Sequence, residues 1–305
     1  MFTNLPREFY IPDSTEIIFV QDFFATDLVG GAELTSDAII RGCTKKLFQV
    51  HGHSLTEGLI RKHQNKIWVF GNQTMVPQHL LQLVLDLGIR YYFFEYDFKP
   101  CVMRCTRKHE IQAGICSCHT AHHGRWTANW MTNARVLFWC SDLQRDKFYN
   151  LFPHLKGKTK DFTQSSTFYP ETILNIRKIR ERKERGELTV LDRWVILDSD
   201  SWIKGTSDAV QYCKDHGMNY VLLKNLTNEQ FLEELAKSKG LVFLPRDIDV
   251  GSRITVEAKL LGDETILNDN VLPKFDPWFH RPLNEIEAYF LEGPSRFWRI
   301  IEGSL

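Results

Sequence analysis

Short runs of apolar residues alternate with helical patterns along almost the whole chain, and this alternation is what most constrains the fold. In the first half, five runs rich in β-branched and aromatic residues fit strands buried on both faces: Ile17–Asp22, Leu47–His51, Ile67–Phe70, Ile89–Glu95 and Val136–Cys140. Segments with helical spacing lie between them, among them Ala32–Gly42, Gln78–Leu87 and Asp142–Phe152. Strands that alternate with helices predict βαβ units and a parallel sheet.

The second half of the chain shows the same alternation. We expect strands at Trp194–Leu197, Tyr220–Leu223, Leu241–Leu244 and Thr265–Leu267. The helices expected between them are Ser207–Asp215, Asn228–Ser238 and Ile254–Leu261. The sequence therefore predicts an α/β protein with two Rossmann-like parallel-sheet domains facing a central cleft. Ligands of open parallel sheets bind at the carboxyl ends of the strands, so functional residues are expected in the loops that follow strands.

The expected domain division follows from this pattern. An N-terminal domain covers residues 1–170, and residues 171–188, dense in Arg, Lys and Glu, form a charged linker or solvated helix. A C-terminal domain covers residues 189–284. A final amphipathic segment, residues 285–305, is interrupted by Gly293-Pro294, and we expect it to pack back on the first domain.

Composition excludes some other classes of protein. With 305 residues, 43% hydrophobic and 25% charged, the chain can form about two globular domains with ordinary cores. The 38 basic and 38 acidic residues cancel, so strong nonspecific attraction to nucleic acid or anionic membrane is not expected. Neither a signal peptide nor a run of roughly 20 apolar residues is recognised. Seven cysteines, an odd number, fit a reducing compartment, so a cytoplasmic location is expected.

The most informative motif follows the third strand expected in the second half. Asp249 and Glu257 are separated by seven residues, with Gly251-Ser252-Arg253 between them at the start of a helix. Glycine lets the backbone approach a ligand closely, and the free amides of a helix N-terminus favour anionic groups. Glu257 can accept hydrogen bonds from paired sugar hydroxyls. By spacing alone, however, an ordinary loop with a capping aspartate and a solvated glutamate is the favoured interpretation.

The same segment resembles the donor-binding segment of retaining GT-B glycosyltransferases, of the kind grouped as family 4-like. Those enzymes have an acidic residue, seven intervening residues, a Glu-Ala pair and a glycine before a strand. Asp249, Glu257-Ala258 and Gly262 stand at these places here. The resemblance implies the GT-B fold, with Glu257 holding the ribose of a nucleotide-sugar. It also implies that Asp249, one methylene shorter than the family's usual glutamate, lies near the donor sugar.

Two further loops fit the same family. Lys204-Gly205 follows the first strand of the second half, where the family supplies a cation to the donor diphosphate and so offsets leaving-group charge. The family's arginine before this lysine is replaced by Asp198 and Ser199, and Arg253 or Arg246 are candidate substitutes. A Gly-Gly pair after the first strand resembles the family's Gly-Gly-x-Glu, although a solvated lysine and a plain turn also fit these loops. The implied donor-binding residues are Gly30, Gly31, Lys204, Gly251, Ser252, Arg253 and Glu257.

Carboxylates end one strand of the first half. Glu95 and Asp97 stand where relatives often carry a histidine, and either can orient an acceptor hydroxyl or act as a base. Capping of the next turn is an equally good interpretation. His51 and His53 after an earlier strand are weaker candidates. With Asp249, the two carboxylates form the candidate catalytic set.

A cluster of cysteine and histidine is the oddest part of the composition. Four cysteines fall within 18 residues and three histidines follow: Cys101, Cys105, Cys116, Cys118, His119, His122 and His123. Thiolates, alone or with imidazoles, can hold a tetrahedral structural zinc, and free thiols are the competing interpretation. A catalytic metal is not expected, because basic residues and helix dipoles serve the leaving diphosphate in GT-B enzymes.

The sequence therefore predicts a metal-independent hexosyltransferase that moves a sugar from a UDP- or GDP-sugar to a hydroxyl of a carbohydrate or other acceptor. Retention of the anomeric configuration is implied by the resemblance. Two alternatives stay open. One is a noncatalytic nucleotide-sugar or nucleic-acid-binding module on the same fold, and the other is a glycosyltransferase acting on modified DNA, which the zero net charge disfavours.

Overall fold

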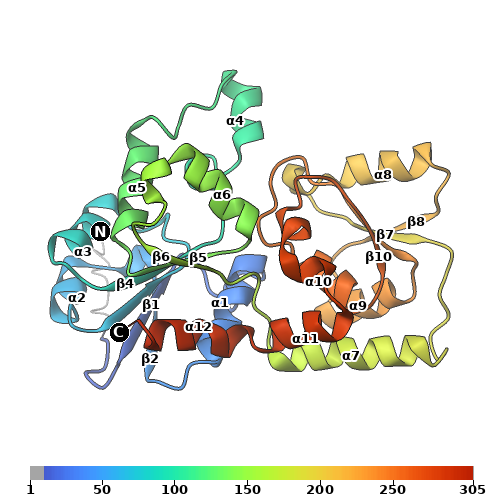
Figure 1. The fold of residues 1–305 in the computed structure, drawn as a ribbon, viewed down its shortest axis with the longest axis horizontal. Helices are drawn as coiled ribbons and strands as arrows, with labels where there is room; N and C mark the ends of the chain where they lie inside the picture. Colours follow the sequence, from blue (N-terminus) through green and yellow to red (C-terminus); the bar gives the residue numbers. More distant parts are fainter. Residues whose placement is uncertain (1–9, 305) are drawn as a thin grey trace, which may run out of the picture.

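Two parallel sheets organise the chain, as the alternation of strands and helices predicts (Figure 1). The computed structural model describes residues 10–304, so the first nine residues and the last residue of the predicted domains lie outside the described part. The first sheet has six strands in the order β2-β1-β3-β4-β5-β6, and the second has four in the order β10-β9-β7-β8. Neighbouring strands are parallel in both sheets.

The first unit contains the six-stranded sheet and its helices. Its elements are β1 (Ile17–Gln21), α1 (Gly31–Arg41), β2 (Leu47–His51), α2 (Glu57–Lys62), β3 (Ile67–Phe70), α3 (Gln78–Asp86), β4 (Tyr91–Glu95), α4 (Thr106–Ala113), α5 (His122–Asn133), β5 (Val136–Trp139), α6 (Asp142–Leu151) and β6 (Lys160–Thr163). Strands β1, β4 and β5 are buried along their whole length, which explains their continuous apolar character. Ser141 caps α6 by accepting a hydrogen bond from the Gln144 amide.

The second unit contains the four-stranded sheet. Its elements are α7 (Pro170–Glu184), β7 (Trp194–Leu197), α8 (Thr206–Asp215), β8 (Tyr220–Leu223), α9 (Asn228–Ala236), β9 (Gly240–Phe243), α10 (Arg253–Leu260), β10 (Glu264–Leu267) and α11 (Leu283–Leu291). Thr227 caps α9 in a capping box with Gln230. Short 3₁₀ turns lie at Gly52–Ser54, Pro153–Leu155, Trp202–Lys204, Leu272–Phe275 and Pro277–His280.

Helix α7 occupies most of the segment expected as a charged linker, and one of its faces is apolar. Ile173, Ile176 and Ile179 recur at three-residue spacing and are buried in the core of the second sheet. Next to this apolar face, the mostly shielded Arg180 forms an ion pair with Glu287 of α11, with 2.9 Å between Nη2 and Oε2. The helix is therefore part of the second unit's packing, and its solvated character is limited to the side away from the sheet.

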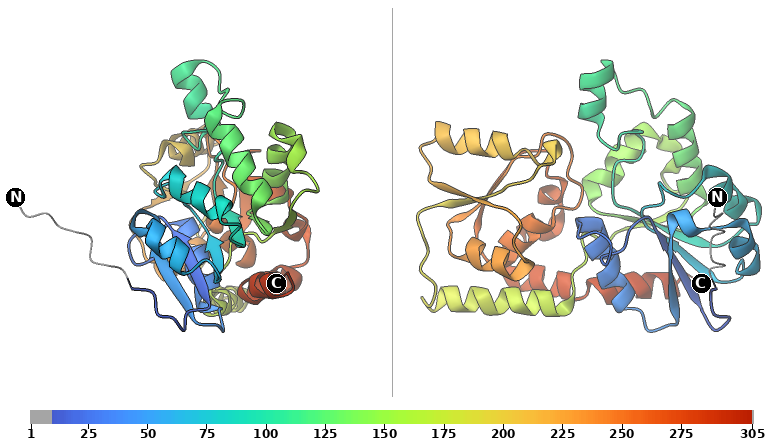
Figure 2. Two further views of the ribbon diagram at one scale, coloured as in Figure 1. Left: turned by 90° about the vertical axis from the view of Figure 1, so that its left-hand side faces the viewer. Right: turned by 180° about the vertical axis from the view of Figure 1, so that it is seen from behind.

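The last helix, α12 (Gly293–Glu302), returns to the first unit (Figure 2). Phe297 and Ile301 are buried in one core with residues of β1, β4 and β5. The indole Nε1 of Trp298 donates a hydrogen bond of 2.8 Å to the carbonyl of Ile39 on α1. The chain thus crosses between the units twice, through the segments before α7 and α12. Within residues 10–304, no helix has the length and apolar character needed to span a membrane.

Candidate active site between the two sheets

Two adjoining cavities lie where the strand ends of the two sheets face each other. The central cavity, about 330 Å³, is lined by the start of α1, the loops after β3 and β4, and the loop after β9. The α9–α10 cavity, about 540 Å³, is lined by the loops after β7 and β8, by α9 and α10, and by the Gly30-Gly31 pair. Gly31, Lys204, Asp249 and Gly251 line both cavities. These four residues, all singled out in the sequence, are therefore brought together.

Lys204 and Asp249 form an ion pair at the junction of the two cavities. Nζ of Lys204 lies 2.7 Å from Oδ2 of Asp249, and the carboxylate raises the pKa of the lysine. The turn that carries Lys204 depends on Gly205, whose φ is +65°. A Cβ at this position would lie 1.9 Å from the carbonyl oxygen of Leu244, so glycine alone lets the turn lie against the end of β9.

Glu257 lies on α10 and faces the α9–α10 cavity from a buried position. Asn228, the first residue of α9, donates a hydrogen bond of 2.9 Å from Nδ2 to Oε1. Burial raises the pKa of Glu257, while the charge of Arg253 and the Asn228 hydrogen bond oppose that rise. The carboxylate is thus anchored in the wall of a cavity, which the solvated-glutamate interpretation does not describe.

Arg253 connects the two units. Its Nη1 donates a hydrogen bond of 2.6 Å to the Thr167 carbonyl, and its guanidinium lies 3.8 Å from the ring centroid of Phe168. Burial lowers the pKa of Arg253 to about 10. The side chain lines the α9–α10 cavity and also contacts the first unit, where its Nη1 lies 3.4 Å from Oγ1 of Thr35.

Gly251 and Ser252 pack closely against other residues of the protein. The Gly251 carbonyl accepts a hydrogen bond of 2.7 Å from Ser166 Oγ, and a Cβ on Gly251 would lie 3.3 Å from Cys140 Sγ. The close approach expected at this glycine is therefore an approach to the first unit. Ser252 is buried and its hydroxyl lies 2.8 Å from that of Thr255.

Glu33 is the glutamate of the Gly-Gly-x-Glu motif and was not among the predicted site residues. It lies in the first turn of α1, is buried, and lines the central cavity. Burial raises the pKa of its carboxyl. Its Oε2 occupies the space beside Gly30, where a Cβ would lie only 2.3 Å away. The Gly-Gly-x-Glu spacing is the sequence signal that points to this residue.

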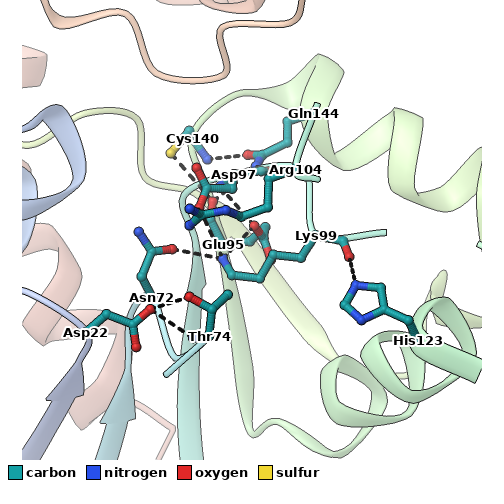
Figure 3. Close-up of polar contacts among 10 residues, drawn as sticks. All are labelled: Asp22, Asn72, Thr74, Glu95, Asp97, Lys99, Arg104, His123, Cys140 and Gln144. Carbon is teal, nitrogen blue, oxygen red and sulfur yellow. Dashed lines mark hydrogen bonds and ion pairs between the residues drawn. The ribbon is translucent and has the colours of Figure 1, made fainter. Parts of the chain in front are cut away.

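Glu95 is not among the residues that line the central cavity, so the catalytic role considered for it is not supported. Figure 3 shows its contact with Lys99. The side chain is fully buried, and its Oε1 accepts hydrogen bonds from Lys99 Nζ at 2.9 Å and from the Asp97 amide at 2.8 Å. Burial raises the pKa of Glu95 to about 7. Glu95 ends the fully buried strand β4 and is absent from the cavity lining, whereas the next carboxylate, Asp97, belongs to it.

Asp97 has two cationic neighbours beside the central cavity. Arg104 Nη1 lies 3.1 Å from its Oδ2, and Lys99 Nζ lies 3.8 Å from the same oxygen. Lys99 also donates a hydrogen bond of 2.9 Å to Asn72 Oδ1. Asn72 and Arg104 line the cavity and were not predicted. Asn72 follows β3, so the strand-end rule can find it, whereas Arg104 lies in the cysteine-rich segment and carries no such signal.

Two weaker candidates lie outside the lining of both cavities. His51 Nε2 lies 2.9 Å from Asp27 Oδ2, which makes it part of a partly exposed pair. Arg246, considered as a second cation for the diphosphate, pairs instead with Asp208 on α8 and its Nη2 donates to Ser207. Asp198 and Ser199, which replace the expected arginine, do line the α9–α10 cavity.

The cysteine-rich segment brings together four potential metal ligands: Cys101, His109, Cys116 and Cys118. This set differs from the four cysteines considered in the sequence. Cys105 instead caps α4, where its Sγ accepts a hydrogen bond from the Lys108 amide. His123 contacts the Lys99 carbonyl at 2.8 Å. A histidine inside α4 therefore takes the place expected for Cys105.

Comparison with known proteins gives the fold. No protein-family model matches the chain, and no curated protein matches it. Solved structures do match along most of its length. An α,α-trehalose-phosphate synthase (UDP-forming) from Burkholderia xenovorans, in complex with glucose-6-phosphate, aligns with a TM-score of 0.55, 9% identity, and coverage of 95% of this chain and 99% of that one.

Two further structures show the same likeness. A trehalose-6-phosphate structure from E. coli, bound with UDP-2-fluoro glucose, gives a TM-score of 0.51 at 9% identity over 95% of this chain and 96% of the other. HepE from Anabaena, in complex with UDP, gives 0.50 at 13% identity over 82% and 80%. The chain therefore has the two-domain α/β fold of GT-B glycosyltransferases, which confirms the expected fold class.

Proposed function

We propose that this protein is a glycosyltransferase that moves a sugar from a UDP-sugar in the α9–α10 cavity to a hydroxyl acceptor in the central cavity. The observation that carries the proposal is the meeting of the two cavities at Lys204 and Asp249, with Glu257 in the wall of the second. Structures that share the fold contain UDP or a UDP-sugar, which favours UDP over GDP as the donor nucleotide.

The donor half of the proposal assigns one function to each end of the α9–α10 cavity. Glu257 accepts hydrogen bonds from the ribose hydroxyls, and its buried setting strengthens such bonds. Lys204 faces the diphosphate, whose oxygens compete with Asp249 for the ammonium group. The N-terminus of α1 at Gly31 adds free amides and the positive end of a helix dipole. Asp249 then lies beside the sugar.

The acceptor half places the hydroxyl near Asp97 in the central cavity. Asp97 orients the hydroxyl and accepts its proton, while Arg104 and Asn72 contribute further polar contacts. In the transfer step, the anomeric carbon forms a bond to the acceptor oxygen and loses its bond to the diphosphate oxygen, so UDP leaves. Retention of configuration is part of the proposal, supported by one trehalose-6-phosphate synthase of this fold whose structure is described in terms of transfer with retention.

A noncatalytic UDP-sugar-binding module is the second candidate. Asp198 and Ser199 line the donor cavity where the family carries an arginine, and the charge of Lys204 is already balanced by Asp249. Both features reduce the positive field available to a leaving diphosphate. Such a protein would bind the donor without releasing UDP.

Release of UDP from a panel of UDP-sugars tests the proposal. We expect turnover by the wild type with at least one donor and acceptor, and a loss of at least tenfold in kcat/KM for Lys204→Met. The matched control is Lys214→Met on the exposed face of α8, which should keep wild-type turnover. Binding of a UDP-sugar with no UDP release across the panel would favour the noncatalytic module. Equal turnover of both lysine variants would refute the position assigned to the diphosphate.

A further inference from the structure

The four ligand atoms of the cysteine-rich segment have the geometry of one tetrahedral site. They all lie within 4.8 Å of one another, and His109 Nδ1 is 3.5 Å from Cys101 Sγ and 3.3 Å from Cys118 Sγ. Around a zinc ion with bonds of about 2.3 Å to sulfur and about 2.1 Å to nitrogen, neighbouring ligand atoms are about 3.5–3.8 Å apart. Small side-chain movements are enough to reach that geometry.

The ligands come from one short stretch of chain. Cys101 lies in the turn after β4, His109 in α4, and Cys116 and Cys118 in the loop after α4. Cys101 and Cys118 are buried, whereas His109 and Cys116 are half-buried. Three thiolates and one imidazole fill all four positions of a tetrahedral site, which is typical of structural zinc. Soft sulfur ligands disfavour magnesium and calcium.

The same stretch has little apolar packing to hold it in place. None of the residues of α4 is buried, and Ile111 and Ile115 are 61% and 81% exposed. Figure 1 shows α4 projecting from the body of the first unit. An eight-residue helix without a buried face is marginal in water, and a metal can supply the folding free energy that a core does not.

We propose that Cys101, His109, Cys116 and Cys118 bind one structural zinc ion, which fixes the loop from Pro100 to Ala121. This inference does not depend on the proposed transfer activity. A disulfide is a poorer account of the cluster, since it uses two of the three thiols and leaves the imidazole without a function in the group.

The loop that the zinc fixes contributes to the central cavity and to the contact between the units. Arg104, between Cys101 and α4, reaches Asp97 in the cavity. At the start of α4, the Arg107 amide donates a hydrogen bond of 2.8 Å to Asp247, which belongs to the loop after β9 in the second unit. The zinc ion therefore positions one wall of the cavity and one connection across it.

Elemental analysis of the full-length protein, purified without a metal-affinity tag, tests the site. We expect about one zinc per chain in the wild type. Cys116→Ser and His109→Asn should lower the retained zinc at least fivefold after dialysis against a weak chelator. Cys105→Ser is the matched control, because Cys105 belongs to the same segment and was a candidate ligand by sequence, and it should keep about one zinc. Equal loss of zinc from Cys105→Ser and Cys116→Ser would overturn the ligand set.

Cobalt titration of the zinc-depleted wild type gives a test that does not depend on how the variants fold. Three thiolates and one imidazole in tetrahedral geometry predict one equivalent of Co²⁺ with intense visible bands and thiolate charge-transfer absorption in the near ultraviolet. Rebinding should also restore the protease resistance of the loop around Cys116. A wild type that carries no zinc and gives no tetrahedral cobalt spectrum would overturn the proposal, as would a disulfide between any two of the ligand cysteines in the freshly purified protein.

Discussion

The buried ion pair of Glu95 and Lys99 allows a quantitative prediction (Figure 3). Both side chains are almost completely shielded from solvent, at 0% and 5% exposure, and 2.9 Å separates Oε1 from Nζ. Lys99→Met removes the cation and keeps most of the side-chain volume. Removal of one partner of a buried pair leaves an uncompensated charge, which costs about 3–5 kcal/mol. We therefore expect Lys99→Met to lower the free energy of unfolding by about that amount at pH 9.

The pKa of Glu95 sets the pH dependence of this cost. The pKa is raised from 4.5 to about 7 in the folded protein, so the folded state binds more protons than the unfolded state between these values. Stability of the wild type accordingly falls as pH rises through this window, by about 3 kcal/mol in total for Glu95 alone at 1.36 kcal/mol per pKa unit. Since Lys99 lowers the pKa of Glu95, the variant should keep losing stability above pH 7, where the wild type no longer does.

Urea denaturation between pH 5 and pH 9 measures the effect, with tryptophan fluorescence as the readout. The difference between Lys99→Met and the wild type should be smaller at pH 5, where Glu95 is protonated in both and only the contacts of Lys99 with Asn72 and Asp97 are lost, and it should grow above pH 7. The double variant Glu95→Gln, Lys99→Met should recover most of the loss at pH 9, and Lys214→Met on the surface should change little. A loss for Lys99→Met that is the same at pH 5 and pH 9 would refute the assignment to Glu95.

Three further predictions concern the fold. Gly205→Ala should lower the free energy of unfolding by more than about 1 kcal/mol, because φ is +65° and the new Cβ would collide with the Leu244 carbonyl; Gly217→Ala, also at positive φ but with open space around it, should cost less. Ile176→Ala should cost about 2–5 kcal/mol, since the side chain is fully buried under the second sheet. Leu174→Ala on the opposite face of α7, 41% exposed, is its control, and equal losses would contradict the amphipathic account. Phe297→Ala should cost about 3–5 kcal/mol by opening the core between α12 and the first sheet. Thermal and urea unfolding measure all of these changes.

Most strands could be predicted from the sequence, because a strand that is buried on both faces consists of a continuous run of apolar residues. Strand β7 begins and ends where the WVIL run does, and β2, β3 and β8 also match their runs. Strand β6 was missed because its residues, Lys160–Thr163, alternate between exposed and half-buried at the edge of the sheet. Helix α4 was missed for a related reason, since a helix that buries no residue shows no apolar period.

The location of the candidate site could be predicted from the sequence, but not which individual side chains reach the cavities. The family resemblance singled out Lys204, Asp249 and Glu257, and all three line the cavities, because the loops after parallel strands and the helices that begin there lie at the same edge of a sheet. The sequence could not separate Glu95 from Asp97, since whether a side chain reaches a cavity depends on the packing of β4 against its neighbours. The pairing of His109 with three cysteines also depends on how α4 folds back, which spacing alone does not determine.

Binding of UDP, measured by isothermal titration calorimetry with the wild type and Glu257→Gln, tests the central claim most directly. A hydrogen bond to a charged group contributes about 1.5–3 kcal/mol, so loss of the carboxylate should weaken UDP binding roughly tenfold to a hundredfold. Glu229→Gln, on the exposed side of α9, should bind UDP as the wild type does. Our account predicts this order of affinities. Wild-type protein that does not bind UDP, or Glu257→Gln that binds it with unchanged affinity, would contradict the assignment of the α9–α10 cavity as the donor site.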